Sequence, residues 1–119
     1  ADKGITSFFM HDVRQTGIDE VVGRTLGIVG DGPVYLTVDV DVLDPAFAPG
    51  TGTPEPGGMT SDDLLWACRT VANELELVGA EVVEVIPTAV GSADITALVA
   101  DRIVREMLNG IALRRRDAG

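Results

Sequence analysis

The sequence predicts an α/β fold in which helices pack on both faces of a parallel sheet. Three observations indicate it. Strand-like and helix-like patterns alternate along the 119 residues in the order β-α-β-loop-α-β-α. Two of the strand segments are nearly continuous apolar runs, which is typical of strands buried on both faces. A long segment rich in glycine and proline joins a strand to a helix within one unit, so the sequence indicates one domain.

The first strand is predicted at residues 5–10 (ITSFFM), an apolar run of strand length. A helix is expected next, because apolar side chains recur at roughly helical spacing from Val13 to Leu26. Its end is predicted near residues 30–33, where glycines and a proline interrupt the pattern. His11 is the only histidine and lies between these two elements, so we expect it to be structural rather than a metal ligand.

The second strand is predicted at residues 34–41 (VYLTVDVD), which are rich in β-branched side chains. Residues 43–59 contain four prolines and four glycines and therefore form a long loop. Loops of this length are uncommon in compact domains and are often functional.

A helix is predicted to begin after Thr60, whose hydroxyl can cap it, with Asp62 and Asp63 at its positive end. Its apolar stripe continues to Val78, and Gly79 is predicted to end it. A strand is expected at residues 80–86 (AEVVEVI), and a last helix at residues 93–108, capped by the serine that precedes it.

Composition excludes several classes of function. The net charge of −10 argues against a nucleic-acid surface, which needs clustered lysine and arginine. The single cysteine, Cys68, excludes an intrachain disulfide framework and agrees with a reducing compartment. No apolar run approaches the roughly 20 residues of a membrane span. We therefore expect a cytoplasmic protein with neither nucleic acid nor membrane as partner.

The most informative residues are Asp39 and Asp41 at the end of the second strand. Side chains alternate along a strand, so the two carboxylates are predicted to project to the same side. Ligands of open parallel sheets bind outside this carboxyl edge. Two close carboxylates repel each other unless a cation neutralises them, and hard ions such as Mn²⁺ or Mg²⁺ suit oxygen ligands. The alternative is a pair of solvated acids.

Three kinds of metal site compete for this pattern. A calcium loop fails, because Asp44 and Gly50 stand where such a loop needs glycine and glutamate. A metal-dependent phosphotransferase would use Asp39 as nucleophile, but the only lysine, Lys3, lies upstream. A glycosyltransferase would use the same acids on a metal-bound nucleotide sugar, and nothing else in the sequence supports nucleotide binding.

The longer string over residues 39–61, DVDVLDPAFAPGTGTPEPGGMTS, closely resembles the signature of the ureohydrolases, the arginase and agmatinase family. The part APGTGTPEPGG is most similar to the agmatinase-like branch. The resemblance extends to Asp12-Val13-Arg14 and to the segment VVEV around Glu84, and it covers essentially the whole chain.

This resemblance implies an arginase-like three-layer fold, of which the chain is the C-terminal part. It also implies a cofactor of two manganese ions that activate water for attack on a guanidinium carbon, giving urea and an amine. Asp39 would bridge the two ions, and Asp41 would bind one of them. Glu84 would contact the guanidinium of the substrate, since a carboxylate forms a bidentate, charge-assisted pair with that group.

The family signature also includes histidine-containing segments, Gly-Gly-Asp-His and Asp-Ala-His-x-Asp, that this chain lacks. We therefore expect residues 1–119 to be the C-terminal portion of one ureohydrolase domain, with the N-terminal metal-ligand segment as a partner. The resemblance further implies a trimer or hexamer. The alternative function is a non-catalytic binding or assembly module that keeps this part of the fold.

Overall fold

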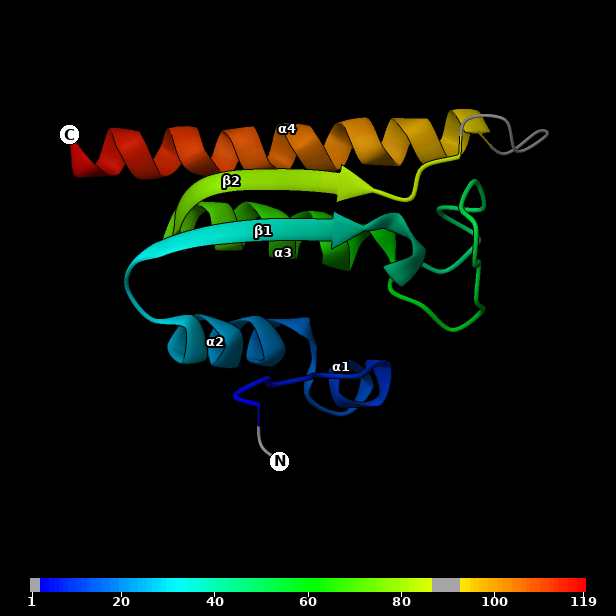
Figure 1. The fold of residues 1–119 in the computed structure, drawn as a ribbon, viewed down its shortest axis with the longest axis horizontal. Helices are drawn as coiled ribbons and strands as arrows, with labels where there is room; N and C mark the ends of the chain where they lie inside the picture. Colours follow the sequence, from blue (N-terminus) through cyan, green and yellow to red (C-terminus); the bar gives the residue numbers. More distant parts are fainter. Residues whose placement is uncertain (1–2, 87–92) are drawn as a thin grey trace.

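The computed structural model describes residues 3–86 and 93–119 (Figure 1). The helices are α1 (Met10–Thr16), α2 (Ile18–Val29), α3 (Ser61–Glu74) and α4 (Ala93–Ala118). The strands are β1 (Pro33–Asp39) and β2 (Glu76–Val83), and a 3-10 turn, η1 (Val40–Val42), follows β1 directly. Within the described ranges, no helix is long and apolar enough to cross a membrane.

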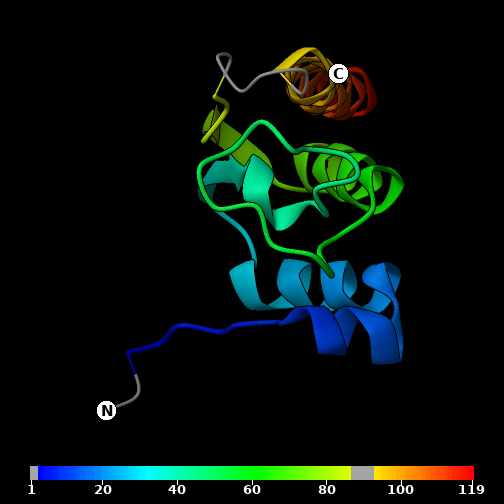
Figure 2. The same cartoon turned by 90° about the vertical axis from the view of Figure 1, so that its right-hand side faces the viewer.

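Strands β1 and β2 pair in parallel, so their carboxyl ends lie at the same edge of the sheet (Figure 1). The register pairs Asp39 with Val83 at that edge. The loop between η1 and α3 covers this end of the molecule, as the end-on view shows (Figure 2). The predicted α/β class with a parallel sheet is therefore confirmed. The carboxyl ends of β1 and β2 bring Asp39 and the segment around Glu84 to the same end of the sheet.

The core lies where the sheet meets α3 and α4. Val38 and Leu36 of β1 point toward it, together with Val82 of β2. Buried residues of α3, α4 and the loop complete it, namely Leu43, Ala48, Met59, Leu64, Cys68, Ala72, Ile103 and Met107. On the other face of the sheet, Tyr35 is 60% exposed.

The prediction of a strand at residues 5–10 is wrong. Residues 5–9 have no regular structure, and Met10 already begins α1. Ile5 and Phe9 are 77% and 64% exposed, so this apolar run is not buried as a strand. The single helix predicted after it is divided into α1 and α2 at Gly17, whose φ of 89° is the left-handed region that favours glycine.

The boundary between α3 and β2 was also misplaced. The helix ends at Glu74 rather than Val78, and β2 occupies residues 76–83 rather than 80–86. A contact distant in sequence marks the helix end, because Arg114 of α4 donates to the carbonyl oxygen of Glu74 at 3.0 Å. Gly79 lies within the strand, where a Cβ would lie 2.7 Å from the ring of Tyr35. That glycine serves close packing, not helix termination.

Two predictions around the loop are confirmed. Residues 43–59 lack a helix or strand of their own, apart from an isolated parallel bridge between Leu43 and Met59. The Thr60 hydroxyl caps α3 by accepting from the N–H of Asp63 at 3.2 Å. The serine predicted to cap the last helix lies outside the described residues. The loop is thus tied at both ends, which fixes its path past the acidic sheet edge.

Candidate functional site

The acidic segment does not continue as a strand. Strand β1 ends at Asp39, and Asp41 lies in the 3-10 turn η1, so strand alternation does not place the two acids together as predicted. The turn does so instead. The Asp41 N–H donates to Oδ1 of Asp39 at 3.1 Å, which curls the chain around the first carboxylate. The two acids thus lie together through a turn rather than through strand alternation.

The two carboxyl groups interact directly. The pKa of Asp39 is raised, chiefly because its burial disfavours the charged form. The hydrogen bond from the Asp41 N–H opposes this shift, whereas the nearby Asp41 carboxylate adds to it. Among the ion pairs of the described residues, none involves Asp39 or Asp41. The pair therefore concentrates negative charge at the sheet edge.

Asp44, the third acid of the segment, has a different environment. Its carboxylate accepts from the N–H groups of Ala46 and Gly57, each at 2.9 Å. These bonds lower the pKa of Asp44. The Asp44 carboxylate therefore organises the turn at the start of the loop and holds it to Gly57.

Glu84 follows the last residue of β2 and is exposed, with a φ of 68°. A non-glycine residue in this left-handed region is uncommon and costs roughly 1–2 kcal/mol. A Cβ built on Gly52 would lie 4.0 Å from Oε2 of Glu84 and 3.6 Å from Cδ1 of Ile86. The loop therefore passes directly beside the predicted substrate-binding carboxylate, on an otherwise open side.

Two threonines of the loop also belong to this edge. The hydroxyl of Thr53 donates to Oδ2 of Asp41 at 2.8 Å, so the loop orients a predicted metal ligand. Thr51 is only 8% exposed, and its Oγ1 has no hydrogen-bond partner among the described residues.

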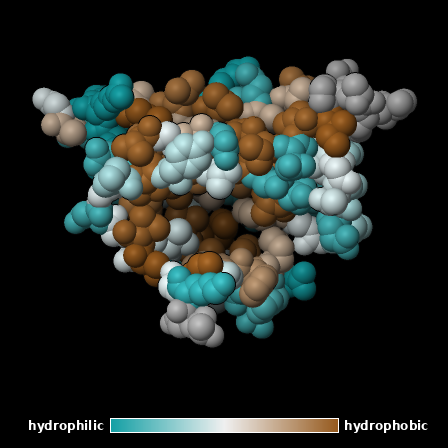
Figure 3. Space-filling view, viewed as in Figure 1, coloured by the Kyte–Doolittle hydropathy of each residue, from teal (hydrophilic) through white to brown (hydrophobic). Residues whose placement is uncertain are grey.

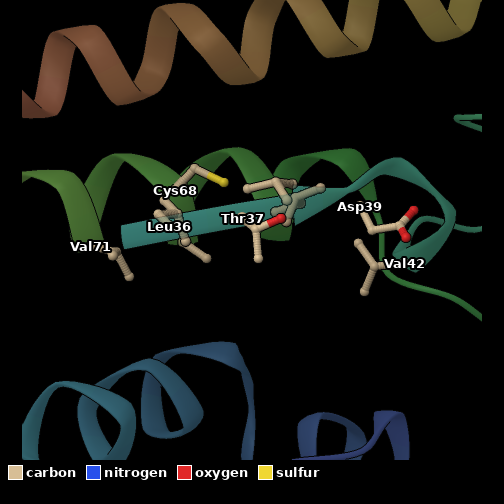
Figure 4. Close-up of a pocket in the computed structure, with 9 residues that line it drawn as sticks. Leu36, Thr37, Asp39, Val42, Cys68 and Val71 are labelled. Atoms are coloured by element: carbon tan, nitrogen blue, oxygen red, sulfur yellow. The ribbon is translucent and has the colours of Figure 1, made fainter. Parts of the chain in front are cut away.

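An apolar groove with a volume of about 320 Å³ runs along β1 and reaches Asp39 at one end (Figure 4). The space-filling view shows this hollow bordered by apolar surface (Figure 3). Cys68 lines it, and burial raises the pKa of that thiol to about 11, so it is neither a thiolate ligand nor a nucleophile near pH 7. The groove's lining is Leu36, Thr37, Val38, Asp39, Val42, Leu64, Ala67, Cys68 and Val71. Such a lining does not suit a guanidinium.

The described residues contain no group of three or more histidine, cysteine or acidic side chains arranged to hold a metal ion. His11 lies on α1, stacked on the ring of Phe9 and 3.4 Å from the carboxylate of Asp12. It lies within the first turn of α1, not between a strand and a helix as predicted. The candidate site consists of Asp39 and Asp41, with Thr53 bound to Asp41, and of Glu84 after the end of β2.

Sequence comparison identifies relatives of this chain. The model of the arginase family matches residues 1–109. Agmatinase from Cronobacter sakazakii is 50% identical over 107 residues, which are 90% of this chain and 34% of that protein. Agmatinase from Escherichia coli O7:K1 is also 50% identical, with the same coverage. The chain spans about a third of the length of these curated relatives.

Solved structures show the same fold. A hypothetical agmatinase from Burkholderia thailandensis has a TM-score of 0.83 and 37% identity, covering 98% of this chain and 39% of that one. Proclavaminate amidino hydrolase from Streptomyces clavuligerus has a TM-score of 0.87 and 38% identity, with 93% and 37% covered. Arginase from Bacillus caldovelox has a TM-score of 0.82 and 35% identity, with 92% and 36% covered. The chain belongs to the arginase family.

Proposed function

We propose that this chain forms part of a manganese-dependent ureohydrolase, which hydrolyses an agmatine-like guanidino compound to urea and an amine. The observation that carries the proposal is the close pair of Asp39 and Asp41, which has no ion-pair partner among the described residues. Two like charges held together at a sheet edge favour a bound cation. Family membership and the agmatinase relatives support this substrate class.

The donor chemistry of the two aspartates fits manganese. Both offer carboxylate oxygens, which suit Mn²⁺ and Mg²⁺, and the Thr53 hydroxyl bond restrains Asp41 in one orientation. In our proposal Asp39 would serve as a ligand for both ions and Asp41 as a ligand for one of them. Bound manganese would supply a Lewis acid that activates water near neutral pH.

Glu84 is proposed to hold the substrate. Glu84 directly follows Val83, which pairs with Asp39 in the sheet, and its Oε2 would lie 4.0 Å from a Cβ at Gly52. A planar guanidinium can donate two charge-assisted hydrogen bonds to such a carboxylate. Glu84 would orient the guanidinium carbon of the substrate toward Asp39 and Asp41. Its negative charge would offset the positive charge of the guanidinium. Water would provide the attacking oxygen.

Two carboxylates do not complete a site for two ions. We propose that the remaining ligands come from a further segment of the same domain, and that the assembly is a homo-oligomer such as a trimer or hexamer. We also retain a cytoplasmic location as a proposal. Because the substrate could be agmatine, guanidinobutyrate, guanidinopropionate or arginine, the assay must cover this panel.

The test is urea release by the assembled enzyme, together with titration of Mn²⁺. We expect two ions per site and urea from at least one compound of the panel. Residues 1–119 alone should release none, because only two ligands are present. Asp41→Asn should abolish both readouts, whereas Asp62→Asn, at an exposed acid of α3, should change neither. A folded assembly that binds no manganese and releases no urea would favour a non-catalytic module.

A further inference from the structure

Three distant parts of the chain meet at Gly50. Its N–H donates to Oγ1 of Thr96 in α4 at 2.7 Å, and its carbonyl oxygen accepts from the N–H of Ile86 at 2.8 Å. Gly50 is buried and Thr96 is 0% exposed, so both bonds lie away from water. Buried hydrogen bonds of this kind are costly to lose, because the abandoned group stays unsatisfied.

The close approach depends on glycine. A Cβ at Gly50 would lie 2.8 Å from Oγ1 and 3.1 Å from Cβ of Thr96, and 3.4 Å from the carbonyl oxygen of Ile86. The first distance is shorter than real Cβ contacts allow. The loop, the segment after β2 and helix α4 are therefore packed to backbone contact at this point.

The three residues after Gly50 reach the proposed site. Gly52 passes near the Glu84 carboxylate, whose Oε2 would lie 4.0 Å from a Cβ at this position, and Thr53 donates to Asp41. Three residues span at most about 10 Å, so a displacement of Gly50 is transmitted to both contacts. The hydrogen bond from the Ile86 N–H to the Gly50 carbonyl oxygen lies two residues after Glu84. It therefore also restrains the backbone near Glu84, whose φ of 68° is unfavourable.

We infer that Thr96 is a positioning residue, which acts through Gly50 to fix Asp41 and Glu84 relative to each other. It touches neither acid itself. Helix α4 would thereby set the distance between Asp41, the proposed metal ligand, and Glu84, the proposed substrate-binding residue. This inference rests on the proposed function for its catalytic consequence, but the Gly50 anchor can be measured without it.

The experiment compares Thr96→Val with Thr96→Ser in the assembled enzyme. Valine keeps the shape and removes the hydroxyl, whereas serine keeps the hydroxyl. We expect Thr96→Val to lower kcat/KM about tenfold, the effect of one buried hydrogen bond, with a raised KM because Glu84 is displaced. Thr96→Ser should restore kcat/KM to within about twofold of the original enzyme.

A matched control is Thr25→Val in α2. The Thr25 hydroxyl donates to the carbonyl oxygen of Val21 at 2.8 Å, within its own helix and outside the site. Its loss should leave kcat and KM unchanged. A fall in kcat/KM for Thr25→Val equal to that for Thr96→Val would show a general effect of threonine loss and overturn the inference.

The second readout is hydrogen exchange of the Gly50 and Ile86 amides, which needs no activity. We expect both amides to lose protection in Thr96→Val and to keep it in Thr96→Ser. If the original enzyme releases no urea, the proposed function fails, and amide protection alone decides whether Thr96 anchors the loop. Lost protection with unchanged kcat and KM would overturn the positioning role. Unchanged protection in Thr96→Val would overturn the anchor itself.

Discussion

Two regions of the molecule contain carboxylates, and they differ in whether arginine side chains compensate the negative charge. Between α3 and α4, the buried Glu106 carboxylate is 6% exposed and lies 2.9 Å from Nε of Arg102 and 3.5 Å from Nη1 of Arg69. At the end of β1, Asp39 and Asp41 lie against each other with no ion pair among the described residues. An acid that joins helices is neutralised from within the chain.

This difference separates a structural acid from a proposed functional one. Burying a carboxylate without a partner is unfavourable, so α3 and α4 each supply an arginine to Glu106. The aspartates receive instead an N–H and a hydroxyl, which orient them without cancelling their charge. The end of β1 thus keeps a negative charge that a bound metal cation can neutralise. We therefore expect substitutions of Asp39 and of Glu106 to have different effects on activity and stability.

The largest expected effect is the loss of urea-releasing activity in the Asp39→Asn variant. Asparagine keeps an oxygen for the Asp41 N–H but removes a proposed bridging ligand. Urea release should fall by more than the roughly 10- to 100-fold typical of losing a partner outside the ligand shell. Stability at pH 7 should not fall, because one of two repelling charges is gone. Initial rates and a denaturant unfolding curve measure the two effects. A less stable variant that keeps full activity would contradict the comparison.

The second effect concerns the packing of α4 against α3. A Cβ on Gly110 would lie 2.5 Å from the Arg69 carbonyl oxygen and 2.6 Å from Cβ of Ala72. Gly110→Ala should therefore lower the free energy of unfolding by about 1–3 kcal/mol, since a packed backbone cannot give way. Gly23→Ala is the control, because it meets nothing within 4 Å. It should stabilise α2 by about 0.5–1 kcal/mol in the same unfolding experiment.

The third prediction tests the charge of the buried acid. Glu106→Gln keeps the size of the side chain but removes the carboxylate between Arg69 and Arg102. We expect a loss of about 1 kcal/mol in unfolding free energy, a modest value because both arginines are half exposed. At temperatures where the variant is folded, KM and kcat should equal those of the parent enzyme. Loss of activity without loss of stability would assign Glu106 to the site.

The smallest effect is the pH dependence contributed by Asp44. Its pKa in the folded protein is lowered below the ordinary 3.8 by the Ala46 and Gly57 N–H groups. The ionised form is therefore the one that stabilises the fold. This contribution is present above pH 3.8 and is lost as the pH falls through the lowered pKa. Asp44→Asn should consequently be less stable than the parent at pH 7, and the difference should shrink at pH 3. An equal difference at both pH values would exclude this ionisation.

The contrast between local and distant contacts explains which elements could be predicted. The Thr60 cap of α3 depends on a residue only three positions away, so the sequence pattern predicts it. The end of α3 depends on Arg114, forty residues away, and was misplaced. The apolar run at residues 5–10 matched a strand by pattern, but no neighbouring strand pairs with it in the described structure.

The sequence by itself determined the class of fold, the family signature over residues 39–61 and the acids that carry the proposed chemistry. Local side-chain chemistry and chain order suffice for these. Only the tertiary structure decided that a turn, not a strand, joins Asp39 to Asp41, and that Thr96 meets Gly50 across 46 positions. Contacts at such separation depend on how layers pack, because their geometry is set by the whole core rather than by neighbouring residues.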